Sequence, residues 1–209
     1  GCNAAMIFQK PSLRTRVTFD IGLKQLGAAG IYLSPAEISL GVRESVYDVA
    51  RNLERWVDLV IARVFAQAAV EELASVGEPP VINALSDDEH PCQAMADYFT
   101  LYERGVKWND FQFAYVGDGN NVCNSLMITG ATLGLHLRIA SPAGFGPGAD
   151  LVRQTEALCR ASGGSLLVTG DPREAVRGAN AVYTDVWASM GQESEAEARK
   201  ALLDRKSVV

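Results

Sequence analysis

The sequence of 209 residues has little that could hold a metal or form a disulfide framework. It contains two histidines and four cysteines, and the cysteines form no C-x-x-C pair. This scatter does not match the ligand spacing of a zinc site, so we expect no bound metal. Unpaired cysteines at this frequency are typical of reduced thiols, which predicts a cytoplasmic protein.

Long apolar runs and an excess of positive charge are also missing. The best run, residues 59–62, is closed off by Asp58 and Arg63 and falls far short of the roughly 20 residues that a membrane-spanning helix needs. No cationic segment precedes an apolar one near the start, so no secretory signal is predicted. The formal charge of −6, from 19 basic and 25 acidic residues, argues against nucleic-acid binding and against an anionic membrane surface as partner.

What the sequence does contain is an alternation of short apolar runs with longer stretches of helical periodicity. The apolar runs predict strands near 4–8, 30–33, 59–62, 81–85, 111–116, 135–140, 165–168 and 181–183. Helices are predicted near 13–26, 43–56, 67–76, 91–104, 121–133, 149–162, 172–178 and 193–204. This order is typical of α/β proteins, in which open parallel sheets carry helices on both faces.

A domain boundary is predicted after the helix at 91–104. Apolar residues recur in this helix at three and four positions and so share one face, namely Cys92, Met95, Phe99 and Tyr102. Gly105 and a polar turn follow, and the strand–helix pattern then restarts. We therefore predict two domains of about 100 residues each, 1–105 and 106–209.

Ligands of open α/β sheets bind beyond the carboxyl ends of the strands, and the first strand is followed there by a good helix start. Ser12 is suited to cap the helix at 13–26, so the free N–H groups of Leu13, Arg14 and Thr15 would point at one anion. The guanidinium of Arg14 can bind a phosphate through two parallel N–H bonds. These residues indicate a phosphate site or an ordinary capped helix with surface arginines.

Two further strand ends carry polar side chains. Arg63 directly follows four apolar residues, so it needs an anionic ligand, an intrachain salt bridge or a route to water. His90 and Gln93 lie three residues apart at a helix start and could both face one ligand. The alternative for them is a capping histidine beside a surface glutamine.

The remaining strand ends carry asparagines and an aspartate. The turn at 117–121 begins like a dinucleotide-binding motif, but Val122 occupies the position of its third glycine, so that reading is rejected. The turn instead presents Asn121 and the asparagine before it. Asp185 follows the last predicted strand, where its carboxylate could bind an ammonium group or cap a helix.

Four motifs in this order resemble the carbamoyltransferases, and specifically those that use ornithine. They are Ser12-Leu13-Arg14-Thr15-Arg16, His90-Pro91-Cys92-Gln93, Gly117-Asp118-Gly119-Asn120-Asn121 and Thr184-Asp185-Val186-Trp187-Ala188-Ser189-Met190-Gly191. The resemblance covers essentially the whole chain. It implies a carbamoyl phosphate domain up to about residue 105, an ornithine domain after it, an active site in the cleft between them, and a homotrimer. It implies no metal and no organic cofactor.

The resemblance also implies roles for individual residues. Ser12, Leu13, Arg14 and Thr15 would hold the phosphate, with Arg63, His90 and Gln93 around the phosphate and carbamoyl groups. Asn121, Asp185, Ser189 and Met190 would hold L-ornithine. Arg63 and His90 would be the catalytic residues, because they would stabilise the charge that grows on the carbonyl oxygen. The reaction would be attack by the neutral side-chain amine of ornithine on carbamoyl phosphate, giving citrulline and phosphate, a step of arginine biosynthesis.

The sequence departs from the family pattern in three places. Leu13 stands where the family usually has Thr, and Ser39 stands where some members have Gln. The chain begins after the family's N-terminal helix and ends at Val209, before the His-Cys-Leu-Pro motif whose cysteine contacts the ornithine amine. We therefore expect either a fragment of a normal enzyme or a chain with impaired activity. A carbamoyltransferase for putrescine or an acylated ornithine, a remnant that binds carbamoyl phosphate without turnover, and an α/β interaction domain remain alternatives.

Overall fold

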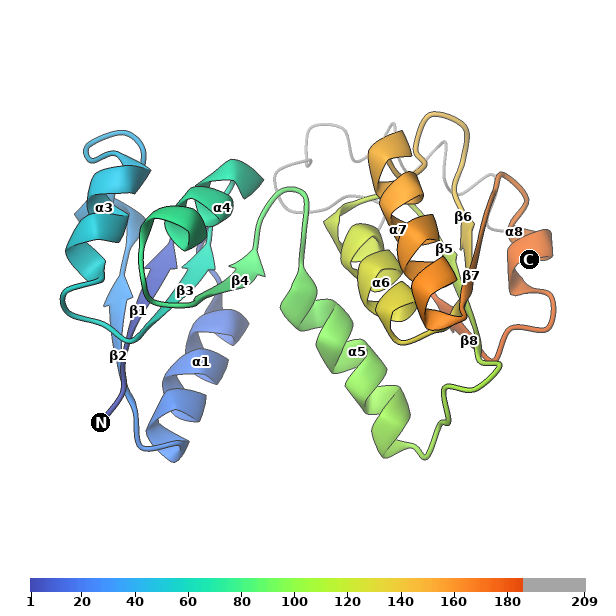
Figure 1. The fold of residues 1–209 in the computed structure, drawn as a ribbon, viewed down its shortest axis with the longest axis horizontal. Helices are drawn as coiled ribbons and strands as arrows, with labels where there is room; N and C mark the ends of the chain where they lie inside the picture. The colour runs from blue at the N-terminus through green and yellow to red at the C-terminus, as the bar shows by residue number, and fades with distance from the viewer. Residues whose placement is uncertain (186–209) are drawn as a thin grey trace. The chain divides into compact units, whose positions relative to one another are not determined.

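The structure, a computed structural model, describes residues 1–185 and contains two compact units. The first unit runs from Gly1 to Cys92, and the second begins at Gln93. Each unit is built on a four-stranded sheet whose strands all pair in parallel (Figure 1). The predicted α/β fold with open parallel sheets is therefore confirmed, while the helix expected at 193–204 lies outside the described residues.

The first unit encloses two cores, one on each face of its sheet. Its strands are β1 (Asn3–Phe8), β2 (Ala29–Leu33), β3 (Leu59–Arg63) and β4 (Val81–Leu85), in the order β2-β1-β3-β4, and its helices before residue 91 are α1 (Leu13–Gln25), α2 (Pro35–Ile38), α3 (Val46–Leu53) and α4 (Gln67–Val76). Ala5 and Ile7 of β1 pack with α3 and α4, whereas Met6 and Phe8 pack with α1 on the opposite face. Because both faces are covered, β1 is a continuous apolar run rather than an alternating one.

The second unit has the same layered construction. Its strands are β5 (Gln112–Val116), β6 (His136–Ala140), β7 (Ser165–Thr169) and β8 (Ala181–Tyr183), in the order β7-β6-β5-β8, and the helices from residue 91 onward are α5 (Pro91–Glu103), α6 (Asn121–Thr132), α7 (Ala149–Ser162) and α8 (Pro172–Val176). Residues of α5, α6 and α7 share one core with β5 and β6, and α8 lies on the other side of the sheet (Figure 1).

Helix α5 packs into the second unit through a face that the sequence pattern did not single out. Its buried residues are Ala94 and Tyr98, and the Tyr98 hydroxyl donates a hydrogen bond of 2.9 Å to the carbonyl of Leu126. Met95 and Phe99 do share a face with Tyr102, as expected from their spacing, but more than half of each side chain is exposed. The two compact units divide near the start of α5, whereas the sequence pattern places a domain boundary after its end.

Residues 1–185 contain neither a helix long and apolar enough to cross a bilayer nor a group of three or more His, Cys, Asp or Glu side chains suited to a metal ion. The four cysteines are free thiols, of which Cys123 and Cys159 are buried. Burial raises the pKa of both buried thiols above the ordinary value.

Candidate functional site

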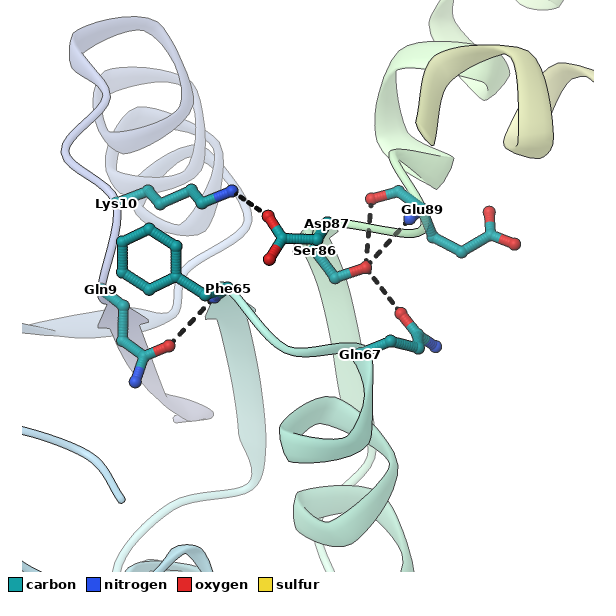
Figure 2. A network of polar contacts seen from close by, with 7 residues as sticks. All are labelled: Gln9, Lys10, Phe65, Gln67, Ser86, Asp87 and Glu89. Atoms are coloured by element: carbon teal, nitrogen blue, oxygen red, sulfur yellow. Dashed lines mark hydrogen bonds and ion pairs between the residues drawn. The ribbon is translucent and has the colours of Figure 1, made fainter. Parts of the chain in front are cut away.

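The carboxyl ends of β1, β3 and β4 lie side by side at one edge of the first sheet. Phe8 on β1 pairs with Arg63 on β3, which in turn pairs with Leu85 on β4. Polar contacts join the loops that follow these strands, and Lys10 after β1 forms an ion pair with Asp87 after β4 (Figure 2). The loops that carry the candidate residues of this unit are therefore tied to one another.

Two glutamines strengthen these connections. The side chain of Gln9 donates to the carbonyl of Leu40 at 3.0 Å and accepts from the backbone N–H of Phe65 at 3.0 Å. Gln67 at the start of α4 accepts a hydrogen bond of 2.6 Å from the hydroxyl of Ser86 (Figure 2). Both glutamines join segments that are distant in the sequence, which fixes the positions of the strand ends.

The start of α1 has the capped geometry that the sequence predicts. Ser12 is in extended conformation with φ −158°, and its side-chain oxygen accepts from the N–H of Thr15 at 3.4 Å. The first N–H groups of a helix have no intrahelical acceptor, and the helix dipole makes this end electropositive. The side chain of Leu13 is apolar and 80% exposed, so only its backbone N–H could donate to an anion. The helix start is confirmed, and its binding of phosphate stays a prediction.

Arg63 is the most unusual charged residue of the first unit, because it is only 3% exposed. Its buried Nε atom has no hydrogen-bond partner, and no carboxylate of residues 1–185 lies within salt-bridge distance of its guanidinium. Burial lowers the pKa of Arg63, and the positive charge of Arg14 lowers it further. An intrachain salt bridge therefore does not explain Arg63 within the described residues, and the two cations favour an anionic ligand.

Arg16 and His90 are placed differently from Arg14 and Arg63. The guanidinium of Arg16 lies 3.8 Å from the ring centroid of Tyr32 on β2, so its positive charge makes a cation–π interaction with that ring. His90 is partly buried and directly precedes α5. Of the two arginines in the first motif, Arg14 is the one whose positive charge lowers the pKa of Arg63.

In the second unit, Asn120 connects the start of α6 to the end of β8. Its side-chain carbonyl accepts from the N–H groups of Val122 and Cys123, both at 3.0 Å, and its amide donates to Asp185 at 2.9 Å. Asn121 is the first residue of α6, so it lies next to this connection. The sequence reading selected Asn121 and Asp185 but missed the role of Asn120, although asparagine is a preferred N-cap residue.

Gly119 is required by a close backbone approach. Its N–H donates to the carbonyl of Phe145 at 2.7 Å, and a Cβ atom at this position would lie 2.5 Å from backbone atoms of Gly146 and Pro147. No side chain fits there without movement of one of the two loops. The glycine thus holds Asn120 in place through backbone packing rather than through a phosphate-binding turn.

The variant Gly119→Ala should therefore lower the free energy of unfolding by about 1–3 kcal/mol, the usual result of overpacking. Gly146→Ala is the matched control, because a Cβ there meets nothing within 4 Å. Chemical denaturation of both variants measures the difference. Equal free energies of unfolding for the two would show that the approach of the loops is not restrictive.

Gln93 and Asp97 form a pair on one face of α5. The Gln93 amide donates to Asp97 Oδ1 at 2.9 Å. Burial raises the pKa of Asp97, the hydrogen bond from Gln93 opposes this, and the negative charge of Asp185 adds to the rise. Burial and the neighbouring Asp97 likewise raise the pKa of Tyr183. Sequence reasoning missed Asp97, whose only signal was its position one helical turn after Gln93.

Two predicted ligands of ornithine, Ser189 and Met190, lie outside the described residues. The remaining candidates fall into two groups. Ser12, Leu13, Arg14, Thr15, Arg63 and His90 belong to the first unit, and Gln93, Asn121 and Asp185 belong to the second. Their binding roles stay predictions.

Comparisons with known proteins agree with the resemblance of the four motifs. Residues 1–103 match the family "Aspartate/ornithine carbamoyltransferase, carbamoyl-P binding domain", and residues 109–208 match the corresponding "Asp/Orn binding domain". The chain is 47% identical over 199 residues to an ornithine carbamoyltransferase of Anoxybacillus flavithermus, covering 95% of this chain and 63% of the relative. It is 48% identical to that of Thermococcus kodakarensis, covering 97% and 64%. The chain thus spans less than two thirds of the length of these relatives.

Solved structures show the same relationship. Ornithine carbamoyltransferase from Pyrococcus furiosus superposes with a TM-score of 0.92 at 47% identity, covering 97% of this chain and 65% of that one. The enzyme from Gloeobacter violaceus gives a TM-score of 0.82 at 38% identity, covering 100% of this chain and 70% of that one. With two adjoining family matches, and with similarity in both sequence and fold over nearly its whole length, the chain belongs to the aspartate/ornithine carbamoyltransferase family.

Proposed function

We propose that the protein transfers the carbamoyl group of carbamoyl phosphate to the side-chain amine of L-ornithine, giving L-citrulline and phosphate. The observation that carries this proposal is the buried guanidinium of Arg63, which lacks a carboxylate partner among residues 1–185. The positive charge of Arg14 lowers the pKa of Arg63 further. The dianionic phosphate group of carbamoyl phosphate, an acyl phosphate, supplies the missing negative charge. The names of the relatives, all ornithine carbamoyltransferases, support the choice of reaction.

In the proposed reaction, the first unit binds carbamoyl phosphate. The phosphate accepts hydrogen bonds from the start of α1 at Ser12, Leu13, Arg14 and Thr15. Arg63 and His90 stabilise the negative charge that grows on the carbamoyl oxygen as the amine attacks. The departing phosphate is basic enough to take the proton from the amine, so the transfer requires no protein base. The family resemblance implies no metal and no organic cofactor.

The amino acid is proposed to bind to the second unit. The carboxylate of Asp185 binds the α-ammonium group of ornithine, and Asn121, Ser189 and Met190 are the other residues that contact this substrate. A substrate with a second carboxylate, such as aspartate, would need additional basic residues, and the sequence has none beside Asn121 or Asp185. The proposal therefore assigns residues up to about 105 to carbamoyl phosphate and the following residues to ornithine. It also includes a homotrimer in the cytoplasm, as the family resemblance implies.

Direct measurement of citrulline tests the proposal. Incubation of the chain with carbamoyl phosphate and ornithine should give citrulline, and putrescine or N-acetylornithine in place of ornithine should give little carbamoylated product. Calorimetric binding of carbamoyl phosphate without any citrulline would support a binding remnant instead. Absence of both binding and turnover would contradict the proposal.

The phosphate site has a test of its own. Arg14→Ala should weaken the binding of inorganic phosphate by about 2 kcal/mol, roughly 30-fold, because a charge-assisted contact is lost. Arg16→Ala removes the same charge two residues further along α1, but the Arg16 guanidinium stacks on Tyr32, so this variant should change the affinity only a little. Isothermal calorimetry with phosphate compares the two. A larger loss for Arg16→Ala than for Arg14→Ala would contradict the assignment.

A further inference from the structure

The hydrogen bond between Gln93 and Asp97 determines which way the Gln93 amide points. A glutamine amide carries a donor NH2 and an acceptor oxygen at nearly equal positions, so its neighbours select its orientation. An ionised carboxylate accepts hydrogen bonds and donates none, so it can pair only with the NH2 group. The contact of 2.9 Å from Gln93 Nε2 to Asp97 Oδ1 is of this kind.

The opposite end of the same amide remains available. No group among residues 1–185 donates a hydrogen bond to Gln93 Oε1, and the side chain is only partly buried. The oxygen can therefore accept from a ligand that carries an N–H group. The carbamoyl group is such a ligand, because its NH2 has two donors and differs in this respect from a methyl group of the same size.

We propose that Asp97 is a positioning residue that holds Gln93 so that its side-chain oxygen accepts from the carbamoyl NH2 group. This inference rests on the proposed function, since it concerns recognition of the carbamoyl end of that substrate. Asp97 acts through Gln93 and does not touch the ligand. Its effect is to make the site distinguish carbamoyl phosphate from other acyl phosphates.

The surroundings of Asp97 agree with a functional rather than a stabilising role. The carboxylate is partly buried, and the negative charge of Asp185 acts on it unfavourably. Hydrogen bonds from Gln93 and Tyr183 lower its pKa, but burial and Asp185 outweigh them, so the ionised form is less favourable in the folded protein than in water. An aspartate in this place therefore does not increase the stability of the fold at neutral pH through its charge.

A series of three ligands separates the proposed role from a general structural one. Inorganic phosphate lacks an acyl group, acetyl phosphate has CH3 in place of the carbamoyl NH2, and carbamoyl phosphate has the complete group. Asp97→Ala should lower the affinity for carbamoyl phosphate about tenfold, as expected for one hydrogen bond, and leave the affinities for phosphate and acetyl phosphate unchanged. Glu103→Ala, which removes an exposed carboxylate from the same helix, should change none of the three.

A donor–acceptor inversion provides a second test. In Gln93→Glu the new carboxylate faces Asp97 and is repelled, so the preference for carbamoyl over acetyl phosphate should fall. In the double variant Gln93→Glu/Asp97→Asn, the amide of residue 97 can donate to one carboxylate oxygen of residue 93 and leave the other for the carbamoyl NH2. The double variant should therefore recover a large part of the preference lost in Gln93→Glu.

Competition calorimetry with the three ligands measures every variant. An equal loss for all three ligands in Asp97→Ala, or no recovery in the double variant, would overturn the positioning role. If the unaltered chain binds carbamoyl phosphate and Asp97→Ala binds it equally well, the inference fails while the proposed function stands. If the unaltered chain binds neither carbamoyl phosphate nor phosphate, the proposed function fails and the inference fails with it.

Discussion

Replacement of Arg63 by methionine is expected to weaken the binding of carbamoyl phosphate more than 100-fold and, at the same time, to stabilise the ligand-free protein. The guanidinium is buried beside Arg14 without a carboxylate among residues 1–185, so its desolvation is not compensated. An apolar side chain of similar length removes this penalty, and we expect the free energy of unfolding to rise by about 1–3 kcal/mol. Loss of the charged contact should weaken the binding of carbamoyl phosphate by about 3 kcal/mol or more.

Thermal unfolding with and without ligand measures both effects. Carbamoyl phosphate or phosphate at about 100 times its dissociation constant should stabilise the unaltered protein by roughly 2.7 kcal/mol, and this increment should vanish in Arg63→Met. Arg55→Met, at an exposed arginine, is the control and should leave the increment unchanged. A less stable ligand-free Arg63→Met protein would show that Arg63 has a compensating partner and would remove the main support for the anion site.

The variant Asp185→Asn is expected to bind ornithine much more weakly and to bind carbamoyl phosphate as before. Asparagine keeps the shape of the side chain and can still accept the hydrogen bond from Asn120, so the connection to α6 is preserved. What it loses is the negative charge for the α-ammonium group. We expect the affinity for ornithine to fall by about 3 kcal/mol, more than 100-fold, since a charged partner is left without its counter-ion.

Calorimetry with ornithine in the presence of phosphate, followed by titration of carbamoyl phosphate alone, tests this separation. Asp110→Asn provides a control of the same chemistry, because Asp110 is exposed and has a φ of 57° that asparagine also tolerates. A parallel loss of both substrates in Asp185→Asn would identify Asp185 as a structural residue. Unchanged affinity for ornithine would contradict its assignment as the ammonium ligand.

The strands were predictable from the sequence because they are short and mostly apolar segments, as β1 and β3 show. The short helix α2 was missed, although Ser34 and Glu37 have the spacing of a capping box and the N–H of Ser34 donates to Glu37 at 2.7 Å. The predicted helix near 43–56 was too long, because Ser45 caps α3 by accepting from the N–H of Asp48. These features are local, so turn and cap chemistry could have revealed them.

The connections within the site could not be predicted in this way. Gln9 joins Leu40 to Phe65, and these partners are 31 and 56 residues away from it in the sequence. Asp97 resembles any polar residue on a helix until the fold brings it under the influence of Asp185. Parallel sheets bring strand ends together over long sequence separations, so motifs at strand ends are predictable whereas the side chains that hold them require the structure.

The contact between Gly119 and the loop at 142–148 also has a consequence for protein engineering. A glycine- and proline-rich surface loop would ordinarily be chosen for a peptide tag or a domain insertion, because such loops tolerate added length. Here the carbonyl of Phe145 and the backbone of Gly146 lie directly against Gly119, next to Asn120 and Asn121. A sequence inserted into this loop would displace the start of α6, so the loop is unsuitable for grafting despite its position on the surface.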